Sequence, residues 1–354
     1  MDHIQQIQAV LAQRGMDALL LTDPISCRYA TGFLYHDGAA LITRDKAWLL
    51  TDTRYFEAAG NAVKAAEVWQ SSPGESLSDK LTALLKDVPG VVGAEETRMA
   101  HGEWAGWESR FGREMTPAAD ILLGLRQSKD EEEKKNLIAA QRIAEKALND
   151  VLELLRPGLT EREVAAELTY RMMKYGGEGN SFDPIVVTGS KSSMPHGVPG
   201  DKVIQSGDFV TMDFGTIKNG YCSDMTRTVV VGKATDEMKE IYNVVLEAQL
   251  AGIAVAKAGV PGKVIDQAGR DVIEKAGYGK YFGHGFGHSL GLEIHEPPNA
   301  NTRNDKPLPL NAVISAEPGI YLPGKFGVRI EDVLFLNEDG CEDITLAPKH
   351  LIEL

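Results

Sequence analysis

The residues best suited to chemistry in this sequence lie in one glycine-rich stretch between Phe282 and Glu296. It carries His284, His288 and His295, interleaved with four glycines. Glycine weakens helices and lets the backbone bend closely around a ligand, and imidazole serves as a metal ligand or as a general acid and base. The stretch is therefore expected to form a site rather than a regular element. Two chemistries compete for it, a serine nucleophile and a metal centre.

The serine interpretation rests on Ser289, because residues 287–291 match the G-x-S-x-G nucleophile elbow of serine hydrolases. That elbow needs an apolar strand before the serine and a helix after it. Residues 281–286 hold too much glycine for a core strand, and two consecutive prolines at 297 and 298 prevent a helix from running on. A serine esterase stays a remote alternative, separated from a metalloenzyme by whether Ser289→Ala or a chelator abolishes activity.

Acidic residues flank this stretch in a pattern that indicates an internal duplication. The segment that opens at residues 157–160 returns 101 residues later at 258–261, and each copy continues from helices into apolar strands. Each copy also carries two acids in register, at shifts of 104 and 107 residues. The matched pairs are Asp213 with Glu317 and Asp224 with Glu331.

Four carboxylates brought together by a pseudo-twofold fold would repel one another, and burying them unpaired would be unfavourable. Two divalent cations would balance their charge. Oxygen ligands with one imidazole suit manganese, iron or cobalt, and zinc is also possible. In a two-metal site the ions lie about 3.5–4 Å apart and share a water or hydroxide as the nucleophile. The glycines between His284 and His288 oppose a helix, so one of the two histidines is expected to ligate and the other to line the pocket.

Length and composition set the frame for this site. A chain of 354 residues suits two domains, and 43% hydrophobic with 25% charged residues is typical of a globular protein. The net charge of −14 argues against nucleic-acid binding. No apolar run reaches the roughly 18 residues of a membrane span, and the first residues lack a signal-peptide pattern, which predicts a cytoplasmic protein with no membrane partner. Cys27, Cys222 and Cys341 are too widely spaced for a cysteine metal cage.

The first third of the chain alternates strand and helix patterns, as in a small α/β domain. Strands are expected at residues 17–22, ending in a turn at Asp23-Pro24, at 39–43 and 47–51 as a hairpin, and at 91–93, with helices around 76–87 and 101–111. A long helix capped by Ser128 is expected to run to Leu155. The predicted domains are therefore residues 1–125 and 126–354.

Six motifs follow one another in the second domain: Met194-Pro195-His196-Gly197, Met212-Asp213-Phe214-Gly215, the run from Tyr221 to Thr228, His284-x-x-x-His288, Glu317-Pro318-Gly319-Ile320-Tyr321 and Val328-Arg329-Ile330-Glu331-Asp332. Together they resemble the proline-specific metallopeptidases, Xaa-Pro aminopeptidase (aminopeptidase P) and Xaa-Pro dipeptidase (prolidase). Residues 29–33 and 51–55 are similar to the creatinase-type N-terminal domain of that family.

The resemblance implies a two-domain fold of mixed α+β and α/β class, in which a creatinase-type N-terminal α/β domain precedes a pseudo-twofold "pita-bread" catalytic domain. It implies two divalent metals, manganese before cobalt, zinc or iron, with Asp224 and Glu331 bridging them. The implied metal ligands are Asp213, Asp224, His288, Glu317 and Glu331. The implied catalytic residues are His196, His284 and His295, which orient substrate and stabilise the tetrahedral intermediate, Glu317 as general base, and Arg329 as the partner of a ligating carboxylate. Ser289 departs from the family, which usually has a second glycine there.

The function expected from this resemblance is a dinuclear-metal exopeptidase that hydrolyses the Xaa-Pro bond at the N-terminus of peptides. Its partners would be peptides with proline at the second position and a second copy of the chain in a homodimer. The modest N-terminal domain favours the aminopeptidase over the dipeptidase, which stays the alternative. Proteins that share the fold without the metal ligands, such as creatinase, are disfavoured because all five candidate ligands are present.

Overall fold

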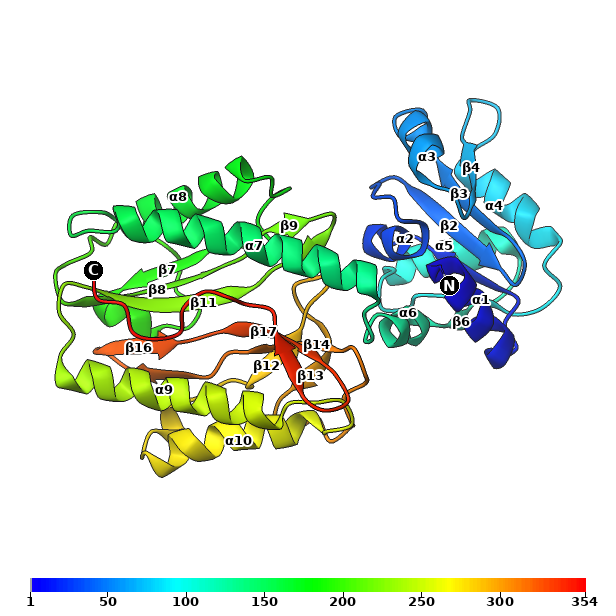
Figure 1. Cartoon of the computed structure of the whole chain (residues 1–354). Helices are drawn as coiled ribbons and strands as arrows, with labels where there is room; N and C mark the ends of the chain where they lie inside the picture. Colours follow the sequence, from blue (N-terminus) through cyan, green and yellow to red (C-terminus); the bar gives the residue numbers. More distant parts are fainter. Residues whose placement is uncertain (1) are drawn as a thin grey trace. The chain divides into compact units, whose positions relative to one another are not determined.

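The computed structural model describes residues 2–354, and the chain divides after Arg126 into two compact units. The first unit is built on one mixed sheet with the strand order β4-β3-β2-β1-β5-β6 (Figure 1). Its strands are β1 (Ala18–Leu21), β2 (Gly38–Thr43), β3 (Ala47–Thr51), β4 (Glu67–Gln70), β5 (Val92–Ala94) and β6 (Thr116–Pro117). Its helices are α1 (His3–Arg14), α2 (Pro24–Thr31), α3 (Phe56–Ala62), α4 (Leu77–Lys86), α5 (His101–Phe111) and α6 (Ala119–Leu125).

The sequence patterns of the first unit translate directly into this sheet. Every residue of β1 is fully buried, because the strand lies between antiparallel β2 and parallel β5. The predicted hairpin of β2 and β3 is confirmed, and so are the helices α4 and α5. The turn predicted at Asp23-Pro24 is wrong. Asp23 instead caps α2, since its carboxylate accepts from the Ser26 backbone N–H and Pro24 fits the first helical turn.

The second unit, Gln127–Leu354, begins with two helices and a first group of strands. These are α7 (Glu131–Leu154), α8 (Glu161–Lys174), β7 (Ile185–Thr188), the short 3₁₀ helix η1 (Gly189–Ser193), β8 (Asp208–Phe214), β9 (Ile217–Lys218), β10 (Tyr221–Cys222) and β11 (Met225–Val231). Strand β8 pairs antiparallel with both β7 and β11.

The rest of the second unit repeats this plan. Its elements are α9 (Asp236–Val255), α10 (Gly262–Lys275), η2 (Gly279–Tyr281), β12 (Gly287–Ser289), β13 (Glu296–Ala300), β14 (Val313–Ala316), β15 (Gly319–Leu322), β16 (Phe326–Arg329), β17 (Asp332–Leu336) and β18 (Cys341–Asp343). Helices α8 and α10 begin 101 residues apart, and β14 pairs antiparallel with β17 as β8 does with β11. The predicted duplication is therefore confirmed in the order and pairing of the elements.

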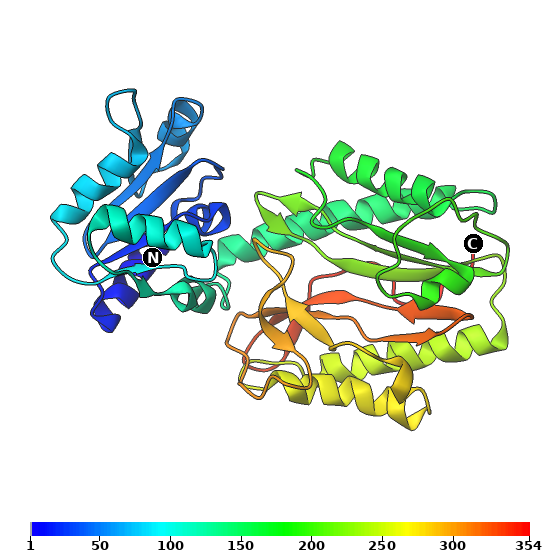
Figure 2. The same cartoon turned by 180° about the vertical axis from the view of Figure 1, so that it is seen from behind.

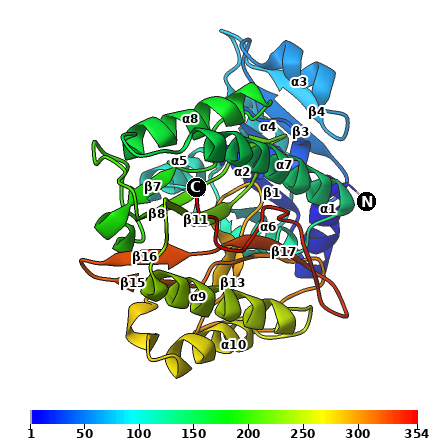
Figure 3. The same ribbon diagram turned by 60° about the vertical axis from the view of Figure 1, so that its left-hand side comes forward.

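The two helix pairs cover the strands of the second unit from opposite sides. Helices α7 and α8 lie along one side, α9 and α10 along the other, and β8, β11, β16 and β17 run between them (Figures 1 and 3). The view from behind shows the same layers (Figure 2). One apolar cluster packs under each helix pair, around Leu148 and Met212 in the first half and around Val245 and Ile330 in the second. The strand ends are thus held rigidly between two cores.

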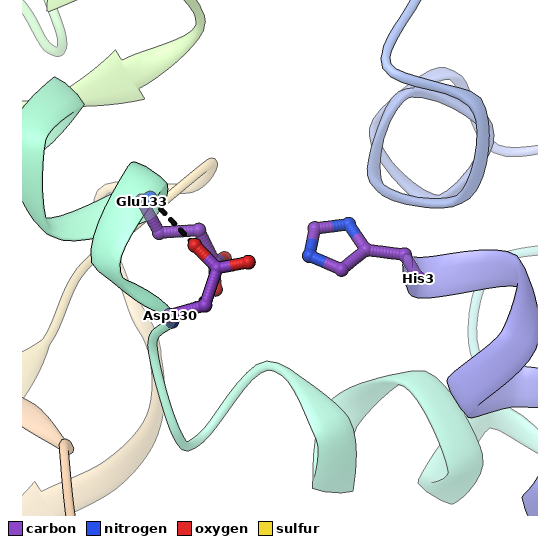
Figure 4. Close-up of side chains that lie close together, drawn as sticks. All are labelled: His3, Asp130 and Glu133. Carbon is purple, nitrogen blue, oxygen red and sulfur yellow. Dashed lines mark hydrogen bonds between the residues drawn. The ribbon is translucent and has the colours of Figure 1, made fainter. Parts of the chain in front are cut away.

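Helix α7 begins two residues later than its sequence pattern suggested. Asp130, not Ser128, is the N-cap, because its carboxylate accepts from the Glu133 backbone N–H at 2.8 Å (Figure 4). The Glu133 carboxylate accepts from the Asp130 N–H in return, which completes a capping box. The Ser128 hydroxyl instead donates to the Leu310 carbonyl. Among residues 2–354, no helix has the length and apolar character needed to cross a membrane.

Candidate metal centre

All nine residues that the family resemblance implies as ligands or catalytic groups line one cavity of about 680 Å³ in the second unit. They are His196, Asp213, Asp224, His284, His288, His295, Glu317, Arg329 and Glu331. The strand order explains how residues so distant in sequence meet. Each half of the duplication supplies two acids at corresponding points of an antiparallel strand pair. The sequence therefore identified a real cluster of side chains, whose roles stay predictions.

The four acids stand at or beside strand ends. Asp213 is the next-to-last residue of β8 and Asp224 directly precedes β11. Glu317 directly follows β14 and Glu331 directly precedes β17. A strand end lets a carboxylate leave the packed sheet and face a cavity, while the neighbouring residues of the strand stay in the apolar core. The duplicated fold thereby presents two acids from each side.

Asp224, His288 and Glu331 each have one potential ligand atom, and these three atoms lie within 4.8 Å of one another. The His288 Nε2 atom is 3.6 Å from Asp224 Oδ2 and 3.4 Å from Glu317 Oε1. Asp213 Oδ1 is buried with no hydrogen-bond partner in residues 2–354, although such atoms are normally satisfied. An orphaned carboxylate oxygen beside three other acids and an imidazole is a donor set that fits divalent metal ions.

Burial and mutual repulsion make the metal-free cluster unfavourable in its charged form. Burial, then the nearby Asp213 and Glu317 charges, raises the pKa of Asp224 well above its ordinary value. Burial, then the Asp224 charge, does the same to the pKa of Glu331. The pKa of Glu317 is also raised, chiefly by burial. A bound dication would reverse these shifts, since it stabilises the ionised form of every ligand.

His288 is held in the state that a metal ligand requires. Its Nδ1 lies 3.2 Å from the Ser289 carbonyl, which can only accept a hydrogen bond, so Nδ1 carries the proton and the Nε2 lone pair faces the acids. Burial lowers the pKa of His288, which keeps the imidazole neutral. Gly287 before it has no room for a side chain, because a Cβ would lie 1.9 Å from the Ser315 carbonyl oxygen. As predicted, residues 284–288 form no helix.

His284 takes a different part in the cavity. Its Nδ1 donates to the Gly285 carbonyl, so its Nε2 accepts from the Tyr321 hydroxyl at 2.9 Å. Burial lowers the pKa of His284 as well. His196 and His295 are exposed at the cavity wall, and the His295 ring packs against that of His288 at a centroid distance of 4.3 Å. These three imidazoles surround the acid cluster without belonging to its tightest group.

Arg329 donates hydrogen bonds to the acid cluster and to two residues beside it. Its Nη2 donates to Asp213 Oδ2 at 2.6 Å, its Nη1 donates to the Tyr321 hydroxyl at 2.8 Å, and its Nε donates to Thr226 Oγ1 at 3.0 Å. The side chain is only 4% exposed. The sequence suggested Arg329 as the partner of a carboxylate, and the geometry provides that contact.

Several supporting residues escaped the sequence interpretation. Ser315 donates to Glu317 Oε1 at 3.2 Å and accepts from the His288 backbone N–H at 3.0 Å. Thr226 donates to Glu331 Oε2 at 2.7 Å. Tyr321 links Arg329 to His284. Strand alternation offers the signal that could have found two of them, because Thr226 and Ser315 each lie two residues from a predicted ligand and so share its face.

Two arginines of the cavity wall were also missed, and they differ in their bonding. Arg270 is committed, because it pairs with Asp266 and donates to the Phe282 and His284 carbonyls. Arg303 lies in the loop after β13, is exposed, and has no ion pair within the described chain. Among the residues that the structure describes, Arg303 is thus the arginine of the cavity wall that is available to an anionic group.

Ser289 does not have the surroundings of a nucleophile. It is fully buried at the end of β12, does not line the cavity, and its hydroxyl has no hydrogen-bond partner in residues 2–354. Alternation along β12 sends His288 toward the cavity and Ser289 away from it. No base from residues 2–354 reaches the hydroxyl, so the geometry gives the esterase alternative no support.

Two family models match the chain. Residues 135–338 match metallopeptidase family M24, and residues 3–128 match the creatinase/prolidase N-terminal domain. Among curated relatives, an uncharacterized peptidase of Bacillus subtilis is 43% identical and a Xaa-Pro dipeptidase of Pyrococcus furiosus is 34% identical, each over 99% of both chains.

Solved structures agree with these matches. A Xaa-Pro dipeptidase from Bacillus anthracis superposes with a TM-score of 0.95 at 41% identity, over 99% of both chains. An X-Pro aminopeptidase from Thermotoga maritima superposes with a TM-score of 0.93 at 39% identity, over 97% of this chain and 99% of the other. The predicted fold class, a creatinase-type domain followed by a pita-bread domain, is confirmed.

Proposed function

Because the chain belongs to metallopeptidase family M24 and carries a creatinase/prolidase N-terminal domain, we propose that it is a dinuclear-metal Xaa-Pro dipeptidase. The carrying observation is that five metal-ligand candidates and one unpaired guanidinium line the same cavity. The sequence had favoured the aminopeptidase. A relative and a solved structure named Xaa-Pro dipeptidase support the dipeptidase better, so the dipeptidase becomes the first candidate and the aminopeptidase the second.

The proposed roles follow from position. Asp213, Asp224, His288, Glu317 and Glu331 hold two divalent ions, with manganese as the first candidate. When bound, the metals lower the pKa of water, polarise the scissile carbonyl and orient the substrate. Glu317 takes the proton of the attacking water as a general base. His196 and His295 orient the substrate and hydrogen-bond the oxygen on which charge develops. His284 helps to orient the substrate as part of the cavity wall, because its two ring nitrogens already contact the Gly285 carbonyl and the Tyr321 hydroxyl.

Arg303 gives the proposed site its preference for dipeptides. A dipeptide carries its terminal carboxylate one residue beyond the scissile bond, inside the cavity, where a longer peptide has an amide. The other arginines of the wall are occupied by Asp266 and Asp213, whereas Arg303 has no ion pair in residues 2–354. A guanidinium binds a carboxylate with two parallel hydrogen bonds, so Arg303 anchors the free end of the dipeptide.

The Xaa-Pro aminopeptidase is the second candidate, and the Thermotoga maritima structure favours it. The two differ only in what lies after the proline, a carboxylate or a further peptide. Manganese, a homodimer and a cytoplasmic location are predictions that accompany either candidate.

Substrate length separates the two candidates. Metal-free protein is reloaded with manganese, cobalt or zinc, and kcat/KM is measured for an Xaa-Pro dipeptide, its C-terminal amide and an Xaa-Pro-Xaa tripeptide. We expect the dipeptide to be cleaved best. Arg303→Gln should raise KM for the dipeptide by about 10- to 100-fold, the value of a charged hydrogen bond, and leave the amide unchanged, while Arg303→Lys restores part of the loss. Preferred cleavage of the tripeptide would establish the aminopeptidase instead, and no cleavage with any metal would reject both.

A further inference from the structure

The Glu331 carboxylate receives its hydrogen bond from a residue of the other half of the duplication. Thr226 lies in β11, is fully buried, and its Oγ1 is 2.7 Å from Glu331 Oε2. Within residues 2–354 it is the side chain that donates to this carboxylate, which is itself only 2% exposed. Asp213 has Arg329 and Glu317 has Ser315 for the same purpose. Glu331 depends on Thr226.

The direction of this hydrogen bond is determined by a third residue. Arg329 Nε–H lies 3.0 Å from Thr226 Oγ1 and can only donate. The threonine hydroxyl therefore accepts from Arg329, and its single proton is left for Glu331. A hydroxyl that accepts from a cation becomes a stronger donor. The chain Arg329 to Thr226 to Glu331 thus favours the ionised carboxylate and holds it in one orientation.

We propose that Thr226 is a positioning residue for the metal centre: its hydroxyl fixes the Glu331 carboxylate and connects that carboxylate to Arg329. This inference rests on the two-metal centre of the proposed function. An ionised carboxylate has about four lone-pair sites, so the hydroxyl of Thr226 leaves the others free for metal ions. Without that hydroxyl, the Glu331 carboxylate is buried with no side-chain donor from residues 2–354 and is free to rotate away from Asp224 and His288.

The duplication itself supplies the variant that tests this role. At the shift of 107 residues that matches Asp224 with Glu331, Thr226 corresponds to Val333, a fully buried residue of β17. Valine therefore fits the equivalent place in the same kind of strand. Thr226→Val keeps the shape and removes the hydroxyl, and Thr226→Ser keeps the hydroxyl.

Thr228 provides a matched control on the same face of β11. It is also buried, and its Oγ1 contacts the Arg329 backbone carbonyl at 3.0 Å and the Thr211 hydroxyl at 3.0 Å, but no carboxylate. Thr228→Val thus removes a buried threonine hydroxyl beside Arg329 without touching a ligand candidate.

The experiment is a calorimetric titration of the metal-free proteins with Mn²⁺. Wild type should bind two ions. Thr226→Val should weaken one of them by about 10- to 100-fold, the usual effect of losing a residue that orients a metal ligand, while Thr226→Ser and Thr228→Val stay within about threefold of wild type. Circular dichroism and melting of the metal-free forms identify a folding defect, and Thr226→Ala replaces Thr226→Val if that variant does not fold.

The outcomes separate this inference from the function on which it rests. Two wild-type-like Mn²⁺ sites in the folded variant that lacks the hydroxyl, Thr226→Val or its replacement Thr226→Ala, would overturn the role of Thr226 and leave the metal centre intact. Equal weakening by Thr228→Val would also overturn it, because any buried threonine would then matter as much. Wild-type protein that binds no Mn²⁺ would overturn the metal centre and this inference together.

Discussion

The two halves of the second unit share a backbone plan but differ in the chemistry they contribute. Each provides a helix pair, an antiparallel strand pair and two acids at matching points. The glycine-rich stretch with its three histidines belongs to the second half alone, and so do Arg303 and Tyr321. A duplication accounts for the symmetric acid cluster, whereas the groups that would contact substrate come mostly from one side.

The positions flanking the paired acids show how the halves diverged. Two residues before Asp224 stands Cys222, and two residues before Glu331 stands Arg329. Two residues after them stand Thr226 and Val333. The polar members of these pairs, Arg329 and Thr226, lie on opposite halves and hydrogen-bond each other at 3.0 Å. Each half therefore provides one polar residue that the other half lacks, and the acid cluster is hydrogen-bonded by both.

The comparison predicts its largest effect when an acid is lost from either half. Asp224→Asn and Glu331→Gln keep the shape and remove one negative charge from equivalent places. Each should lower kcat/KM by about 1000-fold or more, because metal assistance is worth several kcal/mol. The control is Asp343→Asn, a carboxyl outside the cavity that pairs with Lys349. A loss from Asp224→Asn that is far smaller than the loss from Glu331→Gln would show that the two halves do not contribute alike.

The second-largest expected effect is on stability, and it comes from a buried ion pair between the two halves. Arg227 of the first half donates to Asp332 of the second at 2.7 Å, and the two side chains are 2% and 0% exposed. Arg227→Met should lower the free energy of unfolding by about 3–5 kcal/mol. It removes one of the two cations beside the buried Asp332, which keeps Lys349 and Gln249, and it leaves the Glu331 and Ala347 carbonyls without this donor. Arg162→Met, at an exposed pair, should change it by less than about 1 kcal/mol. Urea titration measures both, and equal effects would mean that the pair does not join the halves.

The sequence predicted the cluster because its signal is repeated. Four acids in otherwise apolar strands, matched across one duplication, left few ways to arrange them, and all four line the cavity. The supporting residues could not be found in this way. Thr226 and Glu331 are 105 residues apart, and a threonine in a strand is ordinary by composition. Only the packing of β11 beside the end of β16 makes the contact visible.

Local signals failed where two candidates competed within a few residues. Ser128 and Asp130 both suit a helix cap, and the capping box with Glu133 decides for Asp130. Asp23-Pro24 suits a turn as well as a helix start. Arg303 gave no signal, since an arginine in a polar loop is commonplace until the fold places it in the cavity wall.

The smallest predicted effect concerns the metal-free protein and its dependence on pH. Burial and the neighbouring acids raise the pKa of Asp224 and Glu331 above their ordinary values of 3.8 and 4.5. These two carboxyls therefore bind more protons in the folded metal-free state than in the unfolded state above about pH 4, so they make the free energy of unfolding fall as pH rises toward 7. Asp224→Asn and Glu331→Gln should each flatten this slope and raise the urea midpoint at pH 7. Saturating Mn²⁺ should reverse the slope, because the ions stabilise the charged carboxylates. A pH dependence of the metal-free wild type that neither variant changes would mean that the two halves do not force their acids together.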